Sequence, residues 1–164
     1  MKILIVSDNH RRVNNFIKVY KKVAPIDLLI HCGDAEGSEE SLIEVANCPY
    51  EIVSGNNDYY SLRRSSSLLP EEEFMIGRYR VWLVHGHRHM ISMNSKTISH
   101  EAIRRNMDIV MCGHTHRPLI EISPQLVLLN PGSLEFPRQS CFRPSFIIME
   151  IDRHDEAHYT IGYL

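Results

Sequence analysis

The chain has 164 residues, of which 43% are hydrophobic and 23% are charged, with a formal net charge of −2. This composition is that of an ordinary globular protein, and the length predicts one domain over residues 1–164. The acidic balance argues against a dedicated nucleic-acid-binding protein. No apolar run approaches the roughly 20 residues of a membrane span, so we expect no membrane segment and no signal sequence.

The four cysteines are widely spaced and form no CxxC pair. Cys32 and Cys112 lie at the ends of apolar runs, where a free cysteine usually behaves as a small buried hydrophobic residue. We therefore predict free thiols in a reducing compartment and no disulfide framework. We therefore expect a cytoplasmic protein.

The first third of the chain alternates strand-like and helix-like segments. The expected elements are a strand over 3–6, a helix over 14–23, a strand over 27–31, a helix from Ser38 or Ser41 to Ala46, and a strand over 50–54. A βαβαβ order predicts a parallel sheet with right-handed crossovers.

The rest of the sequence, after residue 60, predicts mainly antiparallel strands and one more helix. After a surface loop over 61–70, we expect a hairpin of 72–76 and 80–84, a helix over 95–106, a strand over 108–112, a hairpin of 119–122 and 126–129, a turn over 130–133, and antiparallel strands over 145–151 and 157–163.

Five apolar runs end in side chains that commonly bind metal ions. These residues are Asp8, His10, Asp34, Asn56, His85, His114 and His116. Open α/β sheets place ligands at the carboxyl ends of their strands. A single histidine or a single Gly-Asp turn would usually be structural, but five in succession favour a common site.

The seven side chains offer three oxygen and four nitrogen donors. Two ions could share them if one carboxylate bridges the pair. Imidazole and carboxylate donors without thiolate suit manganese, iron or zinc. Two ions roughly 3.5–4 Å apart polarise a phosphoryl oxygen and generate a hydroxide nucleophile.

Over residues 1–134 the sequence resembles the calcineurin-like metallophosphoesterase superfamily. The matching motifs are Asp8-x-His10, Gly33-Asp34, Gly55-Asn56-x-Asp58, His85-x-His87 and Gly113-His114-x-His116. The small size and the Asn130-Pro-Gly-Ser133 segment are most similar to compact bacterial and archaeal phosphodiesterases of the YfcE type. The retromer subunit Vps29 is a relative of that branch.

The resemblance implies an α/β fold, a four-layer αββα sandwich of two mixed β-sheets with a metal site at one edge. It also implies two divalent ions per subunit, with manganese favoured over iron, zinc or nickel. Asp8, His10 and His116 would hold one ion, Asn56, His85 and His114 the other, and Asp34 would bridge them. Homodimers or homotetramers occur among such relatives.

The chain departs from the family pattern at two positions. Asn57 stands where many members carry a histidine that protonates the leaving oxygen, and an amide cannot serve as that acid. Arg11 replaces a common glycine; it could bind a substrate phosphate, but a solvated surface charge is the favoured interpretation.

Other polar residues have weaker signals. His87 either contacts substrate or supports His85, whereas Asp58 and Asn130 are expected to order their turns. His31 lies inside an apolar run and is expected to be a hydrogen-bonded core histidine. Ser133 has no nucleophile-elbow motif around it, so a serine hydrolase has no support.

The sequence thus predicts a hydrolase: a metal-dependent phosphoesterase, with a phosphodiesterase favoured, in which a hydroxide held by two ions attacks a small phosphate ester. One alternative is a Vps29-like scaffold that binds proteins without catalysis. Another is a nuclease on the same fold, for which the arginine pairs at 11–12, 63–64 and 104–105 would be suited.

Overall fold

The computed structural model describes residues 1–60 and 68–164. Most of the loop predicted over 61–70, with Arg63 and Arg64, therefore lies outside the described residues. The strands are β1 (Lys2–Val6), β2 (Leu28–His31), β3 (Tyr50–Ile52), β4 (Glu71–Ile76), β5 (Tyr79–Val84), β6 (Ile109–Met111), β7 (Pro118–Ile122), β8 (Val127–Pro131), β9 (Ser145–Ile151) and β10 (Ala157–Tyr163). The helices are α1 (Asn14–Val23), α2 (Glu39–Ala46) and α3 (Lys96–Arg104), with short 3₁₀ turns at Asp58–Tyr60 and His87–His89.

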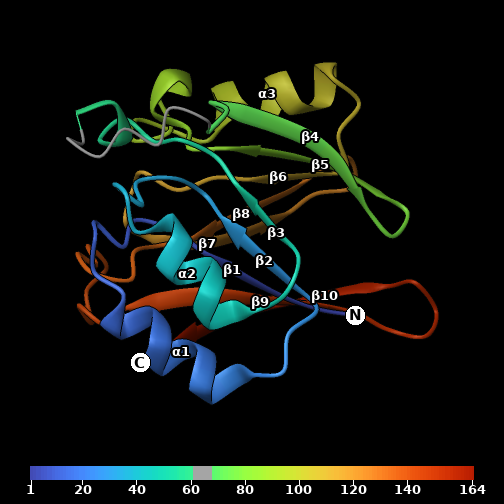
Figure 1. The fold of residues 1–164 in the computed structure, drawn as a ribbon. Coiled ribbons are helices and arrows are strands. Elements are labelled where there is room, and N and C mark those ends of the chain that lie inside the picture. Colours follow the sequence, from blue (N-terminus) through green and yellow to red (C-terminus); the bar gives the residue numbers. More distant parts are fainter. Residues whose placement is uncertain (61–67) are drawn as a thin grey trace.

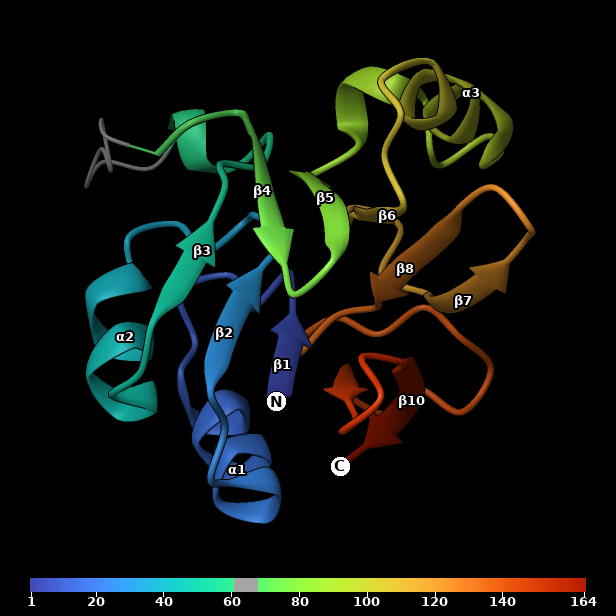
Figure 2. The same ribbon diagram turned by 90° about the vertical axis from the view of Figure 1, so that its right-hand side faces the viewer.

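The strands form two mixed five-stranded sheets, in the orders β10-β9-β1-β2-β3 and β4-β5-β6-β8-β7. In the first sheet β1, β2 and β3 are parallel, and in the second β5, β6 and β8 are parallel. The sheets face each other, with α1 and α2 covering the outer face of one and α3 covering the other (Figures 1 and 2). The predicted four-layer αββα sandwich is confirmed.

Strand β1 shows why the sequence folds into these layers. Side chains of a strand alternate between its two faces. Ile3 and Ile5 accordingly enter the core between the sheets, and Leu4 and Val6 pack beneath α1 and α2. Burial on both faces explains the uninterrupted apolar run, which an alternating surface strand would not have.

Several predicted bounds differ from the structure by one or two residues, and the turn predicted over 130–133 begins inside β8. Two differences have a local cause. The third strand ends at Ile52 rather than at residue 54, because the backbone N–H of Ser54 donates to the carbonyl of Leu69, outside the ladder. Helix α2 does begin after Ser38, but that hydroxyl donates to the Ala35 carbonyl at 2.7 Å instead of capping the helix.

The chain order of the strands places the polar motifs together. Parallel strands of one sheet end at the same edge, and the motifs predicted to bind metal follow β1, β2, β3, β5 and β6. Among the described residues, no helix is long and apolar enough to cross a membrane.

Candidate metal centre

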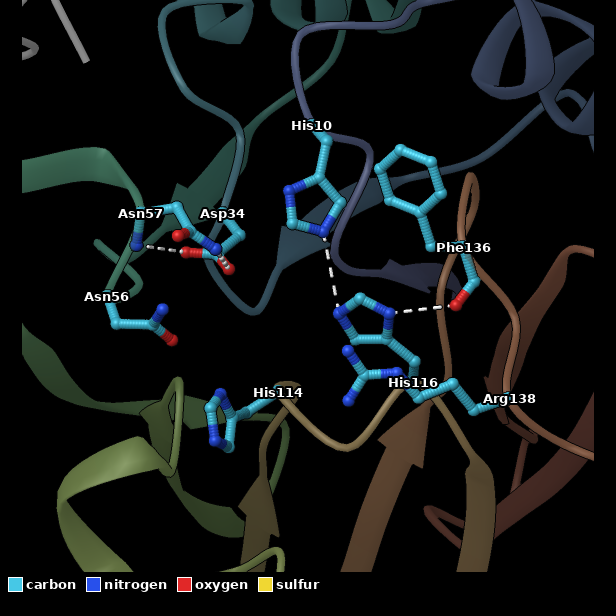
Figure 3. A pocket seen from close by; sticks show the side chains of 8 residues that line it. All are labelled: His10, Asp34, Asn56, Asn57, His114, His116, Phe136 and Arg138. Atoms are coloured by element: carbon cyan, nitrogen blue, oxygen red, sulfur yellow. Dashed lines mark hydrogen bonds between the residues drawn. The ribbon is translucent and has the colours of Figure 1, made fainter. Parts of the chain in front are cut away.

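A cavity of about 220 Å³ opens at this edge of the two sheets. Its lining side chains face a common space (Figure 3); they are His10, Asp34, Asn56, Asn57, His114, His116, Phe136 and Arg138. Five of the seven predicted ligands are among them. The other two, Asp8 and His85, are fully buried and in contact with lining residues.

The donor atoms converge over short distances. Asp8 Oδ1 lies 3.1 Å from His116 Nε2 and 4.0 Å from His10 Nε2. His85 Nε2 lies 3.5 Å from Asp34 Oδ2 and 4.0 Å from Asp8 Oδ1. Two groups of three are therefore close enough to hold an ion each: Asp8 with His10 and His116, and Asp8 with Asp34 and His85.

Hydrogen bonds to the far side of three imidazoles orient them toward this point. Nδ1 of His10 lies 2.7 Å from Glu36 Oε1, that of His85 lies 2.7 Å from the Cys32 carbonyl, and that of His116 lies 2.8 Å from the Phe136 carbonyl. A proton on Nδ1 leaves the Nε2 lone pair available to a metal ion, the usual arrangement of a metal-binding histidine.

Several buried polar atoms at this point have no hydrogen-bond partner. They are Asp8 Oδ1, Asn56 Oδ1 and His85 Nε2. Such atoms are rare in folded proteins because their desolvation is uncompensated. The Nε2 atoms of His10 and His116 also lie 3.4 Å apart. A proton or a cation can lie between two nitrogens at this distance. Together with the unpartnered oxygen and nitrogen atoms, this pair fits divalent ions.

The carboxylates of the centre are held in the ionised form. Burial alone would raise the pKa of Asp8, but the imidazoles of His116 and His85 close to the carboxylate outweigh it and lower that pKa. Burial likewise opposes the charge of His85, yet the nearby carboxylates of Asp34, 3.5 Å from its Nε2, and Asp8 raise its pKa to about 9. The two ionised carboxylates, Asp8 and Asp34, attract cations to this point.

The backbone at the centre is unusual. Five of the predicted ligands have a positive φ: Asp8 (54°), His10 (45°), Asp34 (60°), His114 (68°) and His116 (58°). This region costs a residue with a side chain roughly 1 kcal/mol or more, and such strain persists mainly at functional sites. The turns after the strands are therefore shaped to aim these side chains inward.

Two glycines make room for the carboxylates. A Cβ on Gly55 would lie 2.1 Å from Asp34 Oδ1, and a Cβ on Gly113 would lie 2.1 Å from Ser7 Oγ and 2.9 Å from Asp8 Oδ2. Because these distances are far below van der Waals contact, any side chain would displace the donors. The need for space beside the carboxylates thus explains why glycine occurs at these two motif positions.

Further side chains hold the turns in place. Asp58 accepts backbone N–H bonds from Asp34 at 2.9 Å and from Gly55. Asn130 donates to the Gly113 carbonyl at 2.7 Å, as its expected ordering role requires. Ser133 donates to the carbonyl of Asp8 at 2.8 Å. These residues position the site without facing its cavity.

Three side chains discussed in the sequence analysis do not line the metal cavity. His87 is near the centre, its ring 5.5 Å from that of His85, but it does not line the cavity. Arg11 points to Glu36 at 3.1 Å and is more than half exposed. His31 is buried, bonds Asn9 Oδ1 through Nε2, and burial lowers its pKa to about 4, as expected of a neutral core histidine.

Sequence reasoning missed two lining residues, Phe136 and Arg138. Both follow the Asn-Pro-Gly-Ser segment in a stretch without strand or helix. The N–H of Arg138 donates to the carbonyl of His116 at 2.9 Å, which fixes the arginine beside a predicted ligand. No apolar periodicity marks this stretch, so only the Pro-Arg dipeptide after the turn could have drawn attention to it.

Comparison with known proteins gives concordant results. A family model described as the calcineurin-like phosphoesterase superfamily domain matches residues 1–154. A probable metallophosphoesterase of Bacillus subtilis, YsnB, is 31% identical over 140 residues, which cover 84% of this chain and 78% of that protein.

Two solved structures share the fold. The Escherichia coli phosphoesterase YfcE matches with a TM-score of 0.68 at 20% identity, covering 98% of each chain. Vps29 of Entamoeba histolytica in complex with Zn²⁺ matches with a TM-score of 0.74 at 18% identity, covering 99% of each chain. The predicted resemblance is confirmed: from the family match and the sequence relative, the chain belongs to the calcineurin-like metallophosphoesterase superfamily.

Proposed function

We propose that the chain is a phosphodiesterase that uses two divalent ions, with manganese favoured, to hydrolyse a small phosphodiester. Membership of the superfamily supports a metal-dependent phosphoesterase. The observation that carries the two-ion proposal is the convergence of seven donor side chains, three of which present buried polar atoms with no hydrogen-bond partner. One ion would not take all seven donors, since the two three-residue groups that could each hold an ion have only Asp8 in common.

Asp34 is proposed as the carboxylate that bridges the ions. Asp34 lines the cavity, and among the described residues its two oxygens accept hydrogen bonds only from Asn57, at 2.8 Å from the backbone and 2.6 Å from the side chain. In Asp8, by contrast, Oδ2 is engaged by Ser7 and by the N–H of His114, which leaves Oδ1 for an ion.

The two ions and Arg138 would have separate roles in binding and activating the substrate. When bound, the two ions would polarise the phosphoryl oxygen and activate water as the nucleophile. Arg138 would bind a non-bridging phosphate oxygen through its guanidinium. It is the one permanently cationic side chain among the lining residues, which suits the single negative charge of a diester better than the double charge of a monoester.

The nuclease alternative loses support from the surface charges. All four described arginines of the predicted basic pairs are bound to carboxylates: Arg11 to Glu36, Arg12 to Glu135, Arg104 to Glu101, and Arg105 to Glu71, Glu73 and Glu101. Arginines neutralised in this way contribute little to binding nucleic-acid phosphates.

The scaffold alternative needs an activity measurement, because a Vps29 has been solved with Zn²⁺ and metal binding alone does not separate the two functions. We expect the chelated protein to be inactive and the protein reloaded with Mn²⁺ to hydrolyse bis(p-nitrophenyl) phosphate faster than p-nitrophenyl phosphate. Full metal loading without hydrolysis of either ester would contradict the proposal in favour of a scaffold.

A further inference from the structure

A second cavity adjoins the metal centre. It has a volume of about 500 Å³ and is lined by Ile91, Ser92, Thr115, Arg117, Pro118, Leu119 and Arg138. Arg138 lines both cavities, and Thr115 stands between His114 and His116, so the turn that presents two predicted ligands also forms a wall of the second space. We call this space the adjoining cavity.

The small volume of the metal cavity indicates that a substrate occupies the adjoining cavity as well. Ligand sites usually measure roughly 300–1,000 Å³, and the metal cavity alone has about 220 Å³. That smaller space suits a phosphoryl group with the ions, whereas the ester arms need further room. The adjoining cavity begins at the arginine that would bind the reacting phosphate, so one arm would enter it.

The adjoining cavity is lined by two positively charged side chains, Arg117 and Arg138, that no described carboxylate neutralises. No ion pair found in residues 1–60 and 68–164 includes Arg117 or Arg138, and residues 61–67 contain no carboxylate. The two residues are nevertheless tied together, because Arg117 Nε donates to the Arg138 carbonyl at 3.3 Å. In contrast to the paired arginines described above, the Arg117 side chain is held against the Arg138 backbone, and neither guanidinium has a carboxylate partner among the described residues.

From these features we propose that the adjoining cavity binds a second phosphate group, carried on the non-reacting arm of the phosphodiester. This inference rests on the proposed function. Arg117 would bind the second phosphate through charge-assisted hydrogen bonds, and Arg138, which lines both cavities, would lie between it and the reacting phosphate. Ile91, Pro118 and Leu119 would contact the carbon chain that joins the two phosphates. The substrate class is therefore a diester with a terminal phosphate a short aliphatic linker away.

The first test measures binding and does not depend on catalysis. Propylphosphonate and the ethane-, propane- and butane-bisphosphonates are titrated calorimetrically into the Mn²⁺-loaded wild type and into Arg117→Gln and Arg153→Gln. The third protein is the control, since Arg153 is exposed in the β9–β10 turn and contacts only its neighbour His154 among the described residues. Chelation of ions would affect all three proteins alike, so the difference between proteins is the readout.

We expect at least one bisphosphonate to bind the wild type about tenfold more tightly than propylphosphonate, the gain that one charge-assisted hydrogen bond supplies. Arg117→Gln should lose this preference and Arg153→Gln should retain it. Equal binding of the bisphosphonates by the wild type and Arg117→Gln would overturn the proposal.

The second test compares two esters with the same leaving group, p-nitrophenyl 3-phosphonopropyl phosphate and p-nitrophenyl butyl phosphate. We expect the ratio of their kcat/KM values to favour the first by about tenfold in the wild type and to fall toward one in Arg117→Gln. If neither ester is cleaved while the bisphosphonate preference persists, the phosphodiesterase proposal fails and the anion site stands. If both are cleaved with a ratio of one in the wild type, the anion site fails and the phosphodiesterase proposal stands.

Discussion

Replacing Asp34 by asparagine is expected to lower kcat/KM for a phosphodiester by roughly 10³-fold or more, because the ions supply several kcal/mol of transition-state stabilisation. A carboxylate that bridges two ions serves both, so its loss should also reduce the metal content below two ions per chain. The measurements are steady-state kinetics and elemental analysis of the reloaded variant. If Asp34→Asn kept most of its activity while Asp8→Asn abolished it, the bridging assignment would be wrong.

The chain offers a matched control for this substitution. Asp155 is exposed and has a φ of 60°, the same value as Asp34, so the change to asparagine places the same residue in the same backbone conformation. Asp155→Asn should leave activity and metal content at wild-type levels. A comparable loss in both variants would point to a general effect on folding.

The second large effect is a strong preference for good leaving groups. No imidazole other than the predicted ligands lines the metal cavity, and the amide of Asn57 cannot donate a proton as an acid. A positioned acid is typically worth 10²–10⁴-fold. We therefore expect p-nitrophenyl butyl phosphate to be cleaved far better than dibutyl phosphate, because butoxide is the poorer leaving group and no protein acid protonates its oxygen.

Asn57→His should narrow that preference by accelerating the alkyl ester more than the nitrophenyl ester. Asn57 also donates to Asp34 at 2.6 Å, so Asn57→Gln is the control that alters this contact without adding an acid. The readout is the ratio of kcat/KM for the two esters in the three proteins. An unchanged ratio in Asn57→His, with metal content intact, would show that an acid does not act from this position.

Much of the fold and of the centre could be predicted because both follow from local patterns. The buried run at Ile3–Val6 requires a strand covered on both faces, and the parallel order then brings the residues after each strand to one edge. Asp8, Asp34 and His114 could thus be grouped before any coordinates were known, although they are more than 20 residues apart.

Other parts of the site depend on contacts that no periodicity reveals. Glu36 lies 2.7 Å from His10 Nδ1, yet it falls two residues after the Gly33-Asp34 motif, and nothing in that motif marks Glu36 itself. Arg138 and Arg117 meet only because the backbone of residue 138 pairs with that of His116. Long-range backbone pairing of irregular segments leaves no pattern in the sequence, so the adjoining cavity could not be foreseen.

Seven side chains are proposed to hold two divalent ions, and the number of ions bound per chain tests this proposal. The chelated protein is titrated with Mn²⁺, freed of excess metal and analysed for manganese per chain, with hydrolysis of bis(p-nitrophenyl) phosphate measured at each point. We predict a plateau at about two ions per chain, with activity that rises as the second ion binds. A plateau at one ion or none, or activity that is complete before a second ion is bound, would contradict the account.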